Sequence, residues 1–92
     1  MQRMHVEFMT QLKAAAGCDG MEIECDDPMP VSRVLELVRG RFDALGPMLF
    51  DDQGIRHGWL MVGIDSAIVP RGSDPDVQPG SEVLLATPIS GG

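Results

Sequence analysis

The chain has 92 residues, enough for one domain with a modest hydrophobic core. Its net charge of −7 at pH 7 excludes the basic surface that nucleic-acid binding requires, and it argues against attraction to anionic membranes. The sequence contains no apolar run long enough for a signal peptide or a membrane-spanning helix. We therefore expect a single cytoplasmic domain without nucleic-acid or membrane partners.

The cysteines and histidines do not form a recognisable metal or redox motif. Cys18 and Cys25 match neither a CxxC pair nor the usual spacing of zinc ligands, and His5 and His57 do not cluster with them. Unpaired thiols fit a reducing cytoplasm. Cys25 is predicted to be a small buried hydrophobe rather than a sulfur relay, and both histidines to be surface or edge residues. We predict no metal site and no bound cofactor.

The first half of the chain predicts two strands and two helices. Alternation of apolar and polar residues indicates strands over residues 4–9 and 21–25, separated by a short helical run over residues 11–16. A cluster of Asp and Pro over residues 26–30 breaks regular structure. It is followed by the single long helix, residues 31–42, whose apolar positions form one stripe: Val31, Val34, Leu35, Val38 and Phe42.

The second half predicts three more strands. They are expected over residues 59–64, 67–69 and 82–87, with turns at residues 51–54 and 65–66 and a loop over residues 70–79. This order of elements predicts an α+β fold in which one main helix packs on one face of a mixed sheet. The first and last strands are expected to pair in parallel at the centre of that sheet.

The chain ends in Gly91-Gly92, preceded by Pro88, Ile89 and Ser90. Two residues without a β-carbon allow the end of the chain to lie extended in a narrow channel, so that the Gly92 carboxylate can reach the active site of another protein. We therefore divide the chain into a body, residues 1–87, and a flexible tail, residues 88–92. Gly92 is predicted to carry the chemistry and Gly91 to provide access, while Pro88, Ile89 and Ser90 contact the channel of a partner.

Several segments, in this order, resemble the MoaD/ThiS sulfur carriers. They are the strand-to-helix segment 8–13, the amphipathic helix 31–42, the hairpin 62–66, the strand entry 79–85 and the ending 88–92, which is similar to the MoaD ending Pro-Val-Ser-Gly-Gly. Asp65-Ser66 stands where the family usually has Asn-Gly. The extra length over residues 49–57 resembles the longer carriers, including the CysO group, more than compact ThiS.

The resemblance implies a β-grasp, ubiquitin-like fold and a chain that is not itself an enzyme. It implies that a MoeB/ThiF-like enzyme uses ATP to adenylate Gly92, that a sulfur donor converts it to a thiocarboxylate, and that an acceptor synthase such as a MoaE-like large subunit receives the sulfur. The favoured role is the small subunit of molybdopterin synthase. A carrier for cysteine or thiamine synthesis, a ubiquitin-like modifier conjugated through Gly92, and an interaction domain with a silent tail remain as alternatives.

Overall fold

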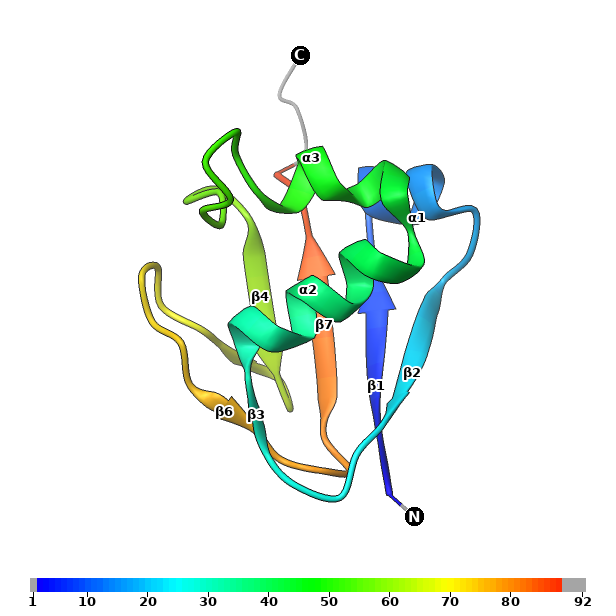
Figure 1. Cartoon of the computed structure of the whole chain (residues 1–92), viewed down its shortest axis with the longest axis vertical. Coiled ribbons are helices and arrows are strands. Elements are labelled where there is room, and N and C mark those ends of the chain that lie inside the picture. The colour runs from blue at the N-terminus through cyan, green and yellow to red at the C-terminus, as the bar shows by residue number, and fades with distance from the viewer. Residues whose placement is uncertain (1, 89–92) are drawn as a thin grey trace.

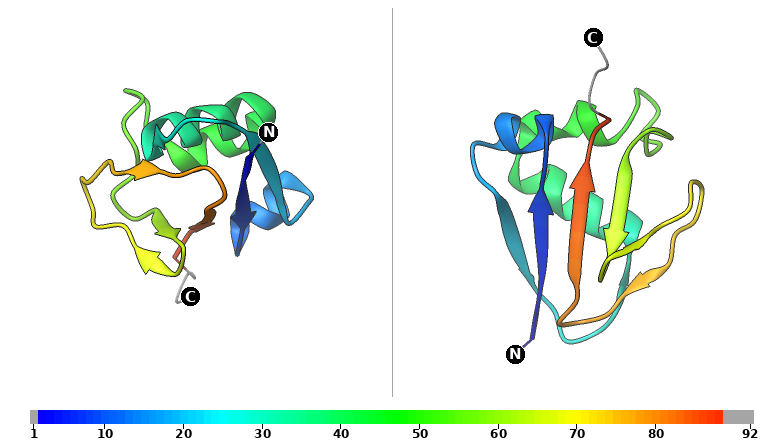
Figure 2. Two further views of the ribbon diagram at one scale, coloured as in Figure 1. Left: turned by 90° about the horizontal axis from the view of Figure 1, so that it is seen from below. Right: turned by 180° about the vertical axis from the view of Figure 1, so that it is seen from behind.

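A mixed sheet with helices on one face makes up the body of the protein (Figures 1 and 2). The computed structural model describes residues 2–88. The strands of the main sheet lie in the order β2-β1-β7-β4-β5. Their bounds are Gly20–Glu24 for β2, Arg3–Phe8 for β1, Glu82–Ala86 for β7, Met61–Ile64 for β4 and Ala67–Ile68 for β5.

The two central strands, β1 and β7, run parallel, as predicted, with Val6 opposite Val83. β2 pairs with β1 and β4 pairs with β7, both antiparallel. Because β1 and β7 point the same way, they end at the same edge of the sheet, which is the upper edge in Figure 1. The end of β7 leads directly into the last described residues, so the chain leaves the body from the end of a central strand.

One helix, α2 (Val31–Arg41), crosses the sheet and supplies one side of the core. The predicted stripe is confirmed, since Val31, Val34, Leu35 and Val38 are fully buried. Phe42 follows the helix end and is half-buried, with its ring 5.4 Å from that of Phe8 in an edge-to-face arrangement. On β1 the alternate residues are buried against this helix face, whereas their neighbours face away.

Shorter helical segments cover the same face near the upper edge. They are α1 (Gln11–Ala16), as predicted, and the 3₁₀ turn Asp43–Leu45 followed by α3 (Gly46–Leu49), which the sequence reading missed. Leu45 and Leu49 are fully buried in the core. A single helical turn that contains Pro and Gly shows no clear 3.6-residue periodicity in its sequence. Its helical conformation is therefore stabilised by tertiary packing.

Two regions predicted as irregular contain short strands instead. β3 (Met29–Pro30) and β6 (Asp76–Val77) pair antiparallel beside the main sheet. Strands of two residues carry no alternation to detect, and Pro is tolerated at an edge where no N–H is needed. The predicted strand over residues 59–64 begins only at Met61, because the Leu60 N–H bonds the His57 carbonyl in a turn.

The β4–β5 turn at Asp65-Ser66 forms without the favoured Asn-Gly pair. Asp65 and Ser66 have φ values of 48° and 74°, in the left-handed region that costs most residues energy. The Asp65 carboxylate accepts hydrogen bonds of 2.9 Å from the Glu82 N–H and from the Ser81 hydroxyl. These bonds lower the pKa of Asp65, the Glu82 N–H contributing most, and they tie the turn to the start of β7.

Candidate functional site

The predicted reactive end of the chain lies only partly within the described residues. Ile89, Ser90, Gly91 and Gly92 fall outside them, so their predicted roles stay predictions. Pro88 is described: it is exposed and follows the buried Thr87 at the end of β7. The structure therefore defines the base from which the tail leaves the body.

This base is held by a hydrogen-bond cluster between Thr10 and Thr87. The Thr10 Oγ1 atom accepts the Thr87 N–H at 3.0 Å and lies 2.8 Å from the Thr87 hydroxyl. It also lies 2.6 Å from the carbonyl oxygen of Met9, to which it can donate its own proton. One hydroxyl can take part in all three contacts as donor once and acceptor twice. The last buried residue before the tail is thereby fixed to the turn between β1 and α1.

Thr10 makes these bonds from an unusual backbone conformation, with φ 57° and ψ −131°. This region is rarely adopted by a residue with a β-carbon, and such strain persists only where surrounding contacts impose it. The sequence reading did not single out Thr10. A Thr just before a helix suggests an ordinary N-cap, but here the side chain makes no cap bond and turns to Thr87 instead.

A second feature beside the tail base is an apolar hollow. Trp59 lies against His57 with ring centroids 4.4 Å apart, and the His57 Nε2 is 2.8 Å from the Pro47 carbonyl oxygen. Trp59 and Pro47, together with Thr87 and Pro88, line the hollow. Trp59 remains 43% exposed, so an aromatic surface lies beside the tail base.

The cysteines and the other potential metal ligands do not form a site in residues 2–88. Cys18 and Cys25 are half-buried free thiols packed against the core, in agreement with the structural role predicted for Cys25. Among residues 2–88 no group of three His, Cys, Asp or Glu side chains could hold a metal ion. Within the same part of the chain, no helix is long and apolar enough to cross a membrane.

The parallel central strands, the helix across one sheet face and a C-terminal segment that leaves the end of a central strand define a ubiquitin-like β-grasp protein. The model of the ThiS family matches residues 6–92. The chain therefore belongs to the ThiS family, whose proteins are small carriers rather than enzymes. Among curated proteins, none matches the sequence.

Several solved structures share this fold. The small archaeal modifier protein 1 (SAMP1) of Haloferax volcanii is 24% identical, with a TM-score of 0.85 over 98% of this chain and 99% of that one. SAMP1 of Methanosarcina acetivorans is 22% identical, with a TM-score of 0.80 over 100% and 98%. A putative molybdopterin converting factor subunit 1 of Pyrococcus furiosus is 16% identical, with a TM-score of 0.70 over 97% and 100%. At these identities the likeness is one of fold.

Proposed function

We propose that the protein is a sulfur carrier that acts through the carboxylate of Gly92. The observation that carries this proposal is the fixed base of the tail. Thr87 directly follows a central strand, is buried and is hydrogen-bonded to Thr10, and the four residues after Pro88 end in Gly-Gly. A reacting group delivered to another protein's active site needs a fixed base and an unhindered tip. The family match, which extends to residue 92, supports the same assignment.

In the proposed reaction, a Gly92 carboxylate oxygen attacks the α-phosphorus of ATP in an adenylating enzyme of the MoeB/ThiF kind and releases pyrophosphate. Sulfide, or a protein that delivers its equivalent, then attacks the acyl carbon and releases AMP. The product is a thiocarboxylate at the C-terminus. ATP is thus a substrate of the partner and not a cofactor of this chain. We place these steps in the cytoplasm, where the free thiols of Cys18 and Cys25 would stay reduced.

For the acceptor we propose a MoaE-like large subunit, which would make this chain the small subunit of molybdopterin synthase. Two observations support that choice over thiamine synthesis. The fold resembles a putative molybdopterin converting factor subunit. The segment between α2 and β4 is also long, and its helical part buries Leu45 and Leu49.

The proposal is tested by incubating the full chain with an adenylating enzyme, ATP and sulfide, followed by intact-mass and fragment mass spectrometry. We expect one oxygen to be replaced by one sulfur at Gly92. Addition of one residue after Gly92 and the substitution Gly91→Leu should each abolish the exchange without changing the circular dichroism spectrum. Misplacement by about 1 Å can reduce a rate on the order of 10²-fold. If the chain with one residue added after Gly92 reacts as fast as the native chain, and the added residue is not removed first, the proposed carrier function is wrong.

A second candidate, a ubiquitin-like modifier, shares the adenylation step and is favoured by the name of the SAMP1 neighbours. In that case Gly92 would form an isopeptide bond with a lysine of a target. Lys13 is the only lysine in this sequence, so lysine-linked chains of the protein could grow only there. Its side chain is exposed beside Asp19 at 3.2 Å. A ladder of self-conjugates lost in Lys13→Arg, with target conjugates retained, would establish the modifier.

A further inference from the structure

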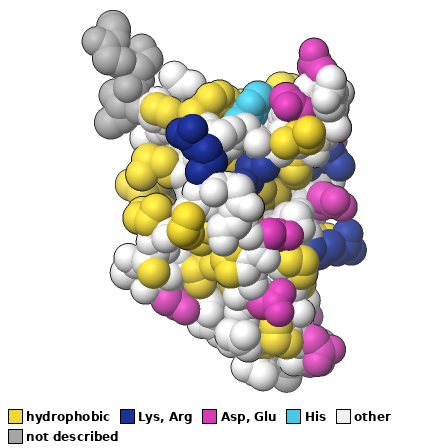
Figure 3. Space-filling model, turned by 90° about the vertical axis from the view of Figure 1, so that its left-hand side faces the viewer, with side chains coloured by type: hydrophobic (Ala, Val, Ile, Leu, Met, Phe, Trp, Pro, Cys, Tyr) yellow, Lys and Arg dark blue, Asp and Glu magenta, His cyan; other side chains and the backbone are white. Residues whose placement is uncertain are grey.

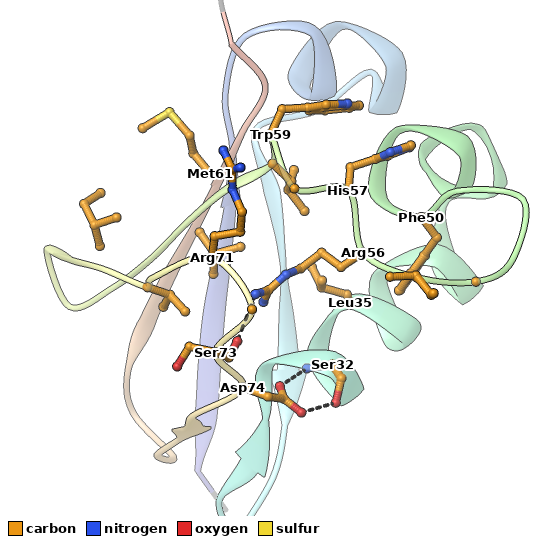
Figure 4. Close-up of a pocket in the computed structure, with 18 of the residues that line it drawn as sticks. Ser32, Leu35, Phe50, Arg56, His57, Trp59, Met61, Arg71, Ser73 and Asp74 are labelled. Carbon is orange, nitrogen blue, oxygen red and sulfur yellow. Dashed lines mark hydrogen bonds between the residues drawn. The ribbon is translucent and has the colours of Figure 1, made fainter.

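A groove with a volume of about 680 Å³ lies at the β4–β5 edge of the sheet (Figure 4). It lies between the N-terminal half of α2 and the loops around residues 54–60 and 69–74. Leu35 and Val62 contribute buried apolar surface, and Pro88 is also among the lining residues. The groove therefore reaches the point at which the tail leaves the body. Its size falls within the range of about 300–1,000 Å³ typical of binding pockets.

Two guanidinium groups enter this groove without a carboxylate partner in residues 2–88. Arg56 donates a 2.9 Å hydrogen bond to the Ser73 carbonyl, and Arg71 forms no hydrogen bond or ion pair within that part of the chain. The Arg71 side chain passes close to Gly58, where a β-carbon would lie 3.5 Å from its Cδ. The other basic side chains are already paired with carboxylates or lie over aromatic rings: Arg3, Lys13, Arg33, Arg39 and Arg41.

The carboxylates that line the groove are already engaged. Asp74 accepts bonds of 2.8 Å from both the N–H and the hydroxyl of Ser32 in the first turn of α2, as Figure 4 shows. Glu36 lies 3.8 Å from Arg33 on the outer face of that helix. The guanidinium of Arg71 is therefore left as a positive charge with no hydrogen-bond or ion-pair partner in residues 2–88. Its complement is an acidic group.

Exposed apolar side chains line the same groove. Trp59, Met61 and Ile68 are 43%, 48% and 65% exposed. In Figure 3, which views this side of the molecule, hydrophobic and basic side chains lie next to one another over the upper half of the face. Figure 4 places Arg71 between Met61, Trp59 and Arg56. Trp, Met and Arg are all enriched in protein interfaces relative to the rest of the surface.

We propose that this groove binds an acidic, apolar segment of the protein that takes up the tail. An acidic side chain of that segment pairs with Arg71, and its apolar neighbours cover Trp59 and Met61. Pro88 connects the groove to the tail base, so a protein that binds the tail would also reach the groove. That such a protein exists rests on the proposed function. The chemistry of the segment rests on the unpaired arginine and the exposed apolar rim alone.

The test uses the full chain and short blocked peptides in which Asp or Glu alternates with Leu or Phe. Trp59 is the only tryptophan, so its fluorescence reports on the groove directly. We expect a saturable blue shift that weakens as salt is raised. The substitutions Arg71→Ala and Arg71→Glu should each weaken binding about tenfold or more, as expected for an interfacial charge pair. Arg3→Ala removes the same charge on β1, outside the groove, and should leave the affinity unchanged.

The outcomes separate this inference from the proposed function. The inference is wrong if no peptide in the panel saturates, if Lys-containing versions of the peptides bind equally well, or if inorganic phosphate or a single-stranded oligonucleotide displaces the acidic peptides at lower concentration. Peptide binding that depends on Arg71, without sulfur incorporation at Gly92, would contradict only the proposed function. Sulfur incorporation at Gly92 that is unaffected by Arg71→Glu, without peptide binding, would contradict only the inference.

Discussion

Thr10 and Thr87 lie 77 residues apart in the sequence, yet their hydroxyl oxygens are 2.8 Å apart at the base of the tail. The contact joins the turn after β1 to the residue after β7, so the two central strands are fastened at the edge from which the tail departs. The unfavourable backbone conformation of Thr10 is maintained by this contact and by the adjacent helix.

Removing the Thr10 hydroxyl should loosen this base. We expect Thr10→Ala to lower the free energy of unfolding by about 1–3 kcal/mol, because the part-buried Thr87 N–H loses its acceptor. Hydrogen exchange of the Thr87 amide should accelerate by more than the global destabilisation explains. Thr10→Ser keeps the hydroxyl and should retain most of the protection. If the Thr87 amide exchanges equally fast in the Ser and Ala variants, the hydroxyl does not hold the tail base.

Truncation of the helix face tests the core assignment. Leu35 is fully buried, so Leu35→Ala should cost about 2–5 kcal/mol through lost burial and a residual cavity. Leu37 is on the same helix but only half-buried, and Leu37→Ala should cost clearly less. Urea denaturation followed by circular dichroism provides both values. Equal midpoints for the two variants would show that the buried face of α2 is assigned incorrectly.

Two glycines should respond in opposite directions to the same substitution. A β-carbon on Gly20 would lie 2.1 Å from the Val6 carbonyl oxygen in the adjacent strand, so Gly20→Ala must displace β2 from β1. We expect a loss of about 1–3 kcal/mol, the scale of overpacking. Gly40 lies in α2 with nothing within 4 Å of its would-be β-carbon, and Gly40→Ala should stabilise by about 0.5–1 kcal/mol. Thermal melts of the two variants should shift in opposite directions.

The hydrogen bonds of Asp65 should make the stability of the protein depend on pH in the acidic range. The Glu82 N–H and the Ser81 hydroxyl favour the ionised carboxylate, so the pKa of Asp65 in the folded state lies below its ordinary value of 3.8. A lowered folded-state pKa stabilises the protein above the unfolded-state value, and this contribution is lost as pH falls through the folded-state pKa. The urea midpoint should therefore fall on acidification below about pH 4, and less steeply in Asp65→Asn.

A matched variant isolates this effect. Asp52→Asn makes the same charge change in an exposed turn, where the Asp52 side chain forms no hydrogen bond within residues 2–88. It should retain the acid dependence of the native chain. If the urea midpoints of Asp65→Asn and Asp52→Asn change identically with pH, the hydrogen bonds of Asp65 do not contribute to acid stability.

Much of the fold follows from local pattern. The alternation in β1 and β2 and the stripe on α2 are periodic over enough residues to specify which side of each element is buried. The parallel pairing of the first and last strands was also expected, and it places the C-terminus at the end of a rigid element. By contrast, β3, β6 and the helical turns over residues 43–49 are too short for a period to be read.

The sequence by itself predicted a reactive end, since Gly91-Gly92 is a local chemical feature that needs no fold to be recognised. It could not determine what surrounds that end. Thr10 meets Thr87, and Arg71 and Trp59 come to line one groove, only after strands and loops distant in the chain are brought together by the sheet. Those contacts depend on register and side-chain direction across several elements, and a single polar residue in a loop carries no periodic signal of its eventual partner.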